Sequence, residues 1–148
     1  TSADGVTSIS STLSKYPSVK YYLVQYGTND ANIAGGLVPS GKGLNPGDPG
    51  YNGSYKDNMQ TIISAIIAAG KTPYLAKIPY STNPNYSDAS IQEYNNVIDE
   101  LVIANGILVT PPNFYTWFQA HPAELADGLH PNGVGYQSMA DLWFTALK

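Results

Sequence analysis

One short motif near the end of the chain has the residue types and the spacing for acid–base chemistry. Asp127-Gly-Leu-His130 places a carboxylate three residues before an imidazole, and Pro131 and Asn132 follow. In a tight turn the Asp127 carboxylate can reach one ring nitrogen of His130, which fixes the tautomer and leaves the other nitrogen free to act as a general base. The structural alternative is that Asp127 caps the turn and His130 caps the last helix.

A second motif follows an apolar segment early in the chain. Gly27-Thr-Asn-Asp30 comes directly after the run 20–26. Glycine lets the backbone approach a ligand closely, and the Asn29 amide can donate a hydrogen bond to a developing negative charge without carrying charge itself. An Asn-Asp pair after a strand is also common turn chemistry, so this motif alone leaves both interpretations open. His121 has no such partner nearby and is expected in a surface loop.

Alternating helices and strands must position these motifs. Apolar residues recur at helical spacing between polar start signals and glycine or proline stop signals, and short apolar runs predict strands. We expect helices at 3–15, at 54–70 and from Ser90 to Gly106, a brief helix carrying Phe114, Trp117 and Phe118, and a last helix that begins at Pro131. We expect strands at 20–26, 72–79 and 107–109, and a long loop at 27–53.

The buried faces of two of these helices can be read from the same periodicity. They are expected to consist of Met59, Ile62, Ile63, Ile66 and Ile67 in the second helix and of Met139, Leu142, Trp143 and Leu147 in the last. The spacing of Phe114, Trp117 and Phe118 also favours core packing over a pocket wall. The alternation of helix and strand predicts an α/β fold, a three-layer α/β/α sandwich with a parallel sheet. In such sheets the loops after the strands carry functional groups, and Gly27–Asp30 lies there.

Taken together, the two motifs are more specific than either alone. Gly27-Thr-Asn-Asp30 after an apolar strand, with Asp127-Gly-Leu-His130 before the final helix, resembles the SGNH hydrolases, also called the GDSL lipase/esterase family. The resemblance covers essentially the whole chain and implies a flavodoxin-like sandwich that hydrolyses esters through an acyl-enzyme. It assigns Asn29 to the oxyanion hole, His130 to the general base and Asp127 to the residue that orients it. It implies no metal and no cofactor.

The chain departs from that family at its front. The family's Gly-Asp-Ser motif, which carries the serine nucleophile, does not occur among the 148 residues. The serines at positions 8, 10, 11 and 14 are expected on a helix surface. We therefore expect residues 1–148 to form a single SGNH-hydrolase-like domain that is N-terminally incomplete and inactive alone. The serine would come from a missing N-terminal segment or a separate companion chain that completes the sheet, because the strand at 20–26 otherwise has an open apolar edge.

A non-catalytic carbohydrate- or acyl-binding module, or an inactive fragment, is the alternative function. The Tyr- and Asn-rich loops at 27–53 and 80–88 fit a binding module if their rings stack on sugar faces. The opposing interpretation is that these rings are tucked against the body of the protein.

Composition excludes several other classes. Seven Lys and no Arg against 11 Asp and Glu give a net charge of −4, which argues against nucleic acid and anionic membranes as partners. No apolar run is long enough to span a bilayer. The lack of cysteine excludes disulfides, thiolate metal sites and a cysteine nucleophile. The uncharged polar character favours a secreted or periplasmic protein, with a cytoplasmic one left open; a small-molecule or carbohydrate ester is the expected substrate.

Overall fold

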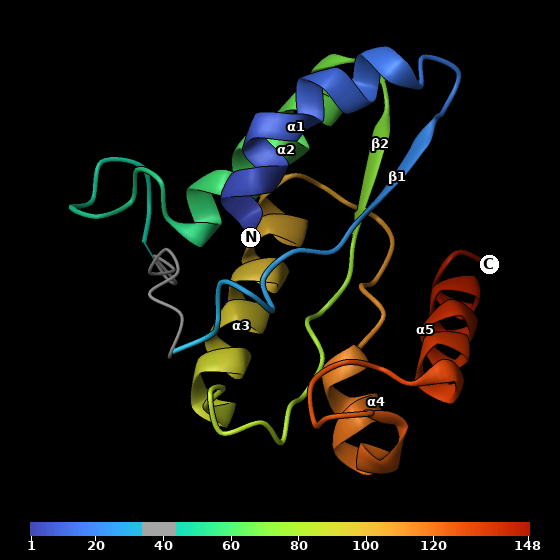
Figure 1. Ribbon diagram of the computed structural model, residues 1–148. Coiled ribbons are helices and arrows are strands. Elements are labelled where there is room, and N and C mark those ends of the chain that lie inside the picture. Colours follow the sequence, from blue (N-terminus) through green and yellow to red (C-terminus); the bar gives the residue numbers. More distant parts are fainter. Residues whose placement is uncertain (34–43) are drawn as a thin grey trace.

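The computed structural model describes residues 1–33 and 44–148 as helices that alternate with short parallel strands (Figure 1). The elements are α1 (Ser2–Lys15), β1 (Tyr21–Val24), α2 (Tyr55–Ala68), β2 (Thr72–Leu75), α3 (Asp88–Ala104), α4 (Phe114–Ala120), the 3-10 helix η1 (Pro122–Glu124) and α5 (Gly133–Ala146). The predicted α/β class is therefore confirmed. Part of the long loop predicted at 27–53 lies outside the described residues.

The described sheet consists of β1 and β2, which pair in parallel from Tyr21 opposite Thr72 to Val24 opposite Leu75. Both strands were predicted, although each is shorter than expected. The third strand predicted at 107–109 is wrong: this segment forms no ladder with β2, and a groove lined by both segments lies between them. Only further along does Asn113 form a parallel bridge with Lys77. Leu108 is 96% exposed, while the neighbouring Ile107 packs against the core.

The larger of two apolar clusters joins the sheet to α1, α2 and α3. Its buried members from α2 and α3 include Met59, Ile62, Ile63, Ile66, Ile91, Val97, Ile98 and Leu101. Each such side chain stabilises the fold by about 1.5–3 kcal/mol through its removal from water. Helices α1 and α2 lie side by side in this cluster (Figure 1). Ile67, predicted on the buried stripe of α2, is instead exposed, so the stripe is narrower than expected.

A second, smaller cluster joins α4, η1 and α5. It buries Phe114 and Phe118 completely, which confirms their interpretation as core. Trp117, Met139, Leu142 and Trp143 pack around them. The Phe114 and Trp143 rings meet edge to face with centroids 6.1 Å apart. Leu147, predicted on the inner face of the last helix, is exposed.

The helix starts follow from capping side chains. Ser54 accepts a hydrogen bond from the Asp57 N–H, as its position in the sequence predicted. The third helix begins earlier than expected, because Ser87 rather than Ser90 is its N-cap. The last helix begins at Gly133, two residues after Pro131, and Asn132 caps it by accepting from the N–H groups at positions 134 and 135. The alternative in which His130 caps this helix is therefore wrong.

The second edge of β1 pairs with no strand in the described part of the chain. Tyr21 and Leu23, which point to the same face of the strand, are 60% and 50% exposed. The Tyr21 ring stacks on the Tyr74 ring of β2 with centroids 5.7 Å apart. One edge and one face of the small sheet thus present apolar groups to solvent. Among the described helices, none is long and apolar enough to cross a membrane.

Candidate functional site

The loop after β1 is tightly packed at Gly27. Its φ of +126° lies in a region that favours glycine. A Cβ atom there would lie 2.8 Å from Cγ2 of Ile78 and 2.9 Å from the Tyr55 hydroxyl oxygen. The loop backbone at Gly27 thus lies directly against side chains of Ile78 and Tyr55, with no room for a side chain of its own.

Tyr55 also binds this loop through its hydroxyl group. The hydroxyl donates a hydrogen bond of 2.9 Å to the carbonyl oxygen of Tyr26. Burial raises the pKa of Tyr55 well above its ordinary value, and the nearby Asp30 and Tyr94 add to the shift. The hydroxyl therefore keeps its proton and remains a donor to the loop.

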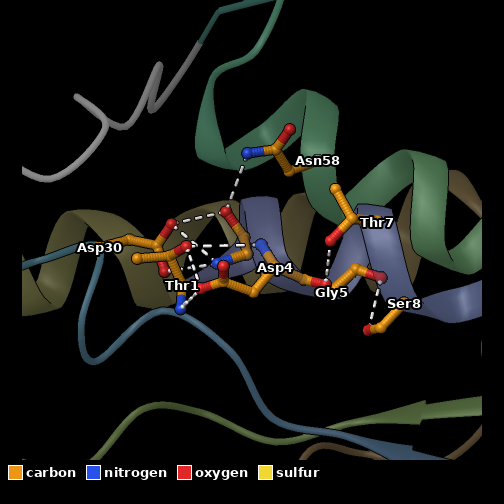
Figure 2. Close-up of polar contacts among 8 residues, drawn as sticks. Thr1, Asp4, Gly5, Thr7, Ser8, Asp30 and Asn58 are labelled. Atoms are coloured by element: carbon orange, nitrogen blue, oxygen red, sulfur yellow. Dashed lines mark hydrogen bonds and ion pairs between the residues drawn. The ribbon is translucent and has the colours of Figure 1, made fainter.

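The last two residues of the motif differ in exposure. Asn29 is exposed, whereas Asp30 is buried and points at the first turn of α1 (Figure 2). The Asp30 carboxylate accepts hydrogen bonds from the N–H and the hydroxyl of Ser2. Sequence reasoning singled out Asn29 but missed this role of Asp30. Its partner, Ser2, lies in α1 and is distant in the sequence, so no local pattern signals the contact.

Asp127 and His130 form the pair that the motif predicts. Oδ2 of Asp127 lies 2.8 Å from Nδ1 of His130. Oδ1 accepts from the N–H groups of His130 at 2.7 Å and Leu129 at 3.0 Å. These bonds, the one from the His130 N–H foremost and then the imidazole contact, lower the pKa of Asp127 from 3.8 to about 2. The Asp127 side chain therefore caps the turn and also contacts the imidazole, so the two interpretations do not exclude each other.

The tautomer of His130 follows from this contact. An ionised carboxylate can only accept, so Nδ1 carries the proton that faces Asp127. Nε2 then has a free lone pair, and within residues 1–33 and 44–148 it makes no hydrogen bond. An imidazole held in this state can remove a proton from a group that lies within hydrogen-bond distance of Nε2.

A cavity of about 310 Å³ brings the two motifs together. Asn29 and His130, from opposite ends of the chain, both line it. Its other described walls include Thr28, Pro79, Leu129, Pro131, Tyr136 and Met139. Asp127 is absent from the described walls and contacts the far side of the imidazole. A hydrogen-bond donor and a proton acceptor therefore share one space, as acyl-transfer chemistry requires.

The serines of α1 do not contribute to this cavity. Ser2 is buried against Asp30. The other four, at positions 8, 10, 11 and 14, are exposed on the helix, and Ser11 and Ser14 donate to backbone carbonyls of the preceding turn. Among the described residues, the cavity is lined by no serine at all. The expectation of a helix-surface role for these four serines is confirmed.

The remaining aromatic and titratable candidates lie elsewhere. His121 is exposed at the end of α4, where its ring stacks on Trp117 with centroids 4.2 Å apart. This confirms its expected surface role. Tyr51 and Tyr86, from the two tyrosine-rich loops, are buried, so their rings are not available to stack on a sugar. In the part of the chain that the structure describes, no group of three His, Cys, Asp or Glu side chains could hold a metal ion.

Solved structures share this fold. The lipase/acylhydrolase from Enterococcus faecalis is 21% identical over 98% of this chain and 69% of its own, with a TM-score of 0.74. An alpha/beta hydrolase enzyme from the metagenome of Lake Arreo, Spain, is 23% identical over 99% and 67%, with a TM-score of 0.70. TesA is 17% identical over 100% and 72%, with a TM-score of 0.68. These likenesses confirm the SGNH hydrolase fold expected from the motifs.

No curated protein is similar enough in sequence to match the chain. The profile of one protein family matches residues 4–138, a span that contains both motifs and most of the cavity walls. The chain belongs to the GDSL-like lipase/acylhydrolase family.

Proposed function

We propose that this chain forms part of a serine ester hydrolase in which His130 is the general base, Asp127 orients it and Asn29 stabilises the oxyanion. The observation that supports this proposal is the shared cavity, where Asn29 and His130 meet although they are far apart in sequence. The 2.8 Å contact between Asp127 and Nδ1 of His130 supports the division of roles.

The geometry suggests how the reaction proceeds. A serine hydroxyl that is hydrogen-bonded to Nε2 loses its proton to His130 as its oxygen attacks the ester carbonyl carbon. The carbonyl oxygen becomes negative, and the Asn29 amide donates a hydrogen bond to it. When the C–O bond breaks, the leaving alcohol takes the proton from Nε2. Water then attacks the acyl-enzyme by the same route, and the ionised Asp127 stabilises the imidazolium that forms in each half-reaction.

We place the nucleophilic serine on a segment outside residues 1–148, either in the same polypeptide or in a companion chain. The open edge of β1 and its exposed Tyr21 and Leu23 support this, because an unpaired edge can accept another strand. Residues 1–148 alone should be almost inert, since removing a triad serine costs on the order of 10⁶ in kcat.

A serine-reactive phosphonate tests this assignment. In a preparation that hydrolyses p-nitrophenyl acetate, peptide mass spectrometry should find the adduct on a serine outside residues 1–148. The variant His130→Ala should abolish the labelling, whereas His121→Ala, at the surface of α4, should label as well as wild type. An adduct on a residue of this chain such as Thr28, or full ester turnover by residues 1–148 alone, would contradict the proposal.

The substrate class can be determined by comparing esters directly. The cavity walls combine apolar groups from Leu129, Pro79 and Met139 with polar groups from Thr28 and Asn29, which suits an acyl group next to a polar alcohol. Short-chain and long-chain p-nitrophenyl esters and acetylated sugars should therefore be compared by kcat/KM. Sugar binding without turnover in the active preparation would instead favour a non-catalytic binding module.

A further inference from the structure

An oxyanion donor works only when its position is fixed before the reaction begins. Asn29 is exposed in the loop that follows β1, and its amide can be placed reproducibly only if the backbone that carries it is held. The following residue, Asp30, is only 3% exposed and accepts hydrogen bonds from Ser2 of α1 and Tyr94 of α3. The contacts of Asp30 can therefore restrain the backbone next to Asn29.

The side chain of Asp30 is bound to α1 and, through it, to α2. The Ser2 N–H lies 3.1 and 2.9 Å from the two carboxylate oxygens, and the Ser2 hydroxyl donates to Oδ1 at 2.5 Å. The same hydroxyl oxygen accepts from Nδ2 of Asn58 at 3.0 Å (Figure 2). A buried carboxylate that is satisfied in this way cannot move without leaving charge and donors unpaired.

The backbone of Asp30 is bound to α3. The Tyr94 hydroxyl donates a hydrogen bond of 2.6 Å to the Asp30 carbonyl oxygen. The Tyr94 ring packs against that of Tyr55 with centroids 4.8 Å apart, and the Tyr55 hydroxyl donates to the Tyr26 carbonyl. The loop is thus held on both sides of Asn29 by two buried tyrosines from different helices.

We infer that Asp30 and Tyr94 are positioning residues for Asn29, which hold the loop backbone so that the amide is aimed at the oxyanion. Neither residue needs to contact substrate for this role, because both act through the backbone at position 30, directly after Asn29. The inference rests on the proposed function of Asn29. It adds that the oxyanion donor depends on a buried hydrogen-bond network reaching α1, α2 and α3.

A double-mutant cycle between Tyr94→Phe and Asn29→Ala tests the inference in the active form of the hydrolase that contains this chain. Tyr94→Phe keeps the ring and removes only the hydroxyl. We expect it to lower kcat about tenfold with KM within about twofold, because a misplaced donor weakens the transition state more than substrate binding. In the Asn29→Ala background, Tyr94→Phe should cause no further loss of kcat.

The matched control is Tyr115→Phe. This tyrosine also donates to an oxygen, Oδ1 of Asp88 at 2.8 Å, but it lies between α3 and α4, away from the loop. Tyr115→Phe should leave kcat and KM unchanged relative to the parent in each background, wild type or Asn29→Ala. If Tyr94→Phe proves too unstable, Ser2→Ala removes one bond to the Asp30 carboxylate and should show the same dependence on Asn29.

The double-mutant cycle distinguishes a wrong role for Asn29 from a wrong positioning role for Tyr94. If Asn29→Ala leaves kcat unchanged, the proposed role of Asn29 is wrong and the inference falls with it. If Asn29→Ala lowers kcat but Tyr94→Phe lowers it equally in both backgrounds, the proposed function stands and the positioning role is overturned. A Tyr94→Phe effect that vanishes without the Asn29 amide supports the inference.

Discussion

Nδ1 of His130 lies 2.8 Å from Oδ2 of Asp127, while the backbone N–H of the same histidine donates to Oδ1. One carboxylate therefore holds both the ring and the backbone of a single residue. The bond from the His130 N–H fixes the position of the His130 backbone in the turn. The bond from Nδ1 fixes the rotation of the imidazole ring, so the direction of Nε2 is determined within this short turn.

Replacing Asp127 with Asn should separate orientation from turn formation. The Asn side-chain oxygen can still accept from the N–H groups of Leu129 and His130, but its NH₂ group cannot accept from Nδ1. The wrong tautomer should lower kcat on the order of 10⁴, with little change in Tm. Steady-state kinetics and thermal unfolding measure the two effects. Asp127→Ala, which removes both sets of bonds, should in addition lower Tm, and a kcat within tenfold of wild type in Asp127→Asn would refute the orienting role.

The low pKa of Asp127 predicts a pH-dependent part of the stability. Its value of about 2 in the folded chain lies below the ordinary 3.8, so the ionised carboxylate stabilises the fold at pH values above about 4. This contribution is lost as the pH falls from about 4 to about 2. Urea unfolding at several pH values in this window should show a shallower loss of unfolding free energy in Asp127→Asn. Asp141→Asn, in the exposed face of α5, should keep the wild-type slope.

Removing the Asn29 amide should affect the reaction but not the fold. Because Asn29 is exposed, Asn29→Ala should leave Tm within a few degrees of wild type. Loss of an oxyanion donor should lower kcat on the order of 10²–10³. Kinetics with p-nitrophenyl acetate measure this, with Asn52→Ala at an exposed loop position as the control. A variant that keeps more than half of the wild-type kcat would contradict the assignment.

A side chain at position 27 should destabilise the protein. In Gly27→Ala the new Cβ would meet Ile78 and Tyr55 below 3 Å, at a φ that L-residues rarely adopt. We expect a loss of about 3 kcal/mol in the free energy of unfolding, measured by urea titration. Gly133→Ala at the start of α5 is the matched control, since nothing lies within 4 Å of its Cβ position. Equal stability of the two variants would show that the packing around position 27 can relax.

The open edge of β1 should make the isolated chain self-associate. Exposed apolar side chains next to unpaired backbone groups favour pairing between copies, and a charge on the strand opposes it. Leu23→Lys should raise the concentration at which residues 1–148 associate by about tenfold, as measured by sedimentation. Ile103→Lys, which places the same charge at an exposed site of α3, should not. An effect of equal size in both variants would point to net charge rather than to the strand edge.

Local signals in the sequence predicted most helices and both paired strands. Ser54 followed by Asp57 marked the start of α2, and the capping bond is there. Ser87 and Ser90 carry similar signals, and in the structure the helix starts after Ser87, whose side chain accepts from the Ser90 N–H. The apolar run 107–109 predicted a strand, but strand formation needs a partner strand at hydrogen-bonding distance, and in the described part of the chain this segment pairs with none.

The candidate site was predictable where its contacts are local and was missed where they are not. Asp127 and His130 are three residues apart, so their spacing alone indicated the contact. The contact between Asp30 and Ser2 joins a loop to a different helix, and the fit of Tyr55 against Gly27 depends on how α2 lies on the sheet. Such contacts arise from tertiary packing and leave no local pattern.

The division of the core into two clusters has a practical consequence for spectroscopy. Both tryptophans of the chain, Trp117 and Trp143, pack in the smaller cluster of α4, η1 and α5. The larger cluster contains tyrosines but no tryptophan. Tryptophan fluorescence therefore reports on the part of the protein that presents His130, while far-UV circular dichroism sums over all helices, of which α1, α2 and α3 contain most of the helical residues. Coincident transitions by the two probes would mean that both halves of the candidate site unfold together.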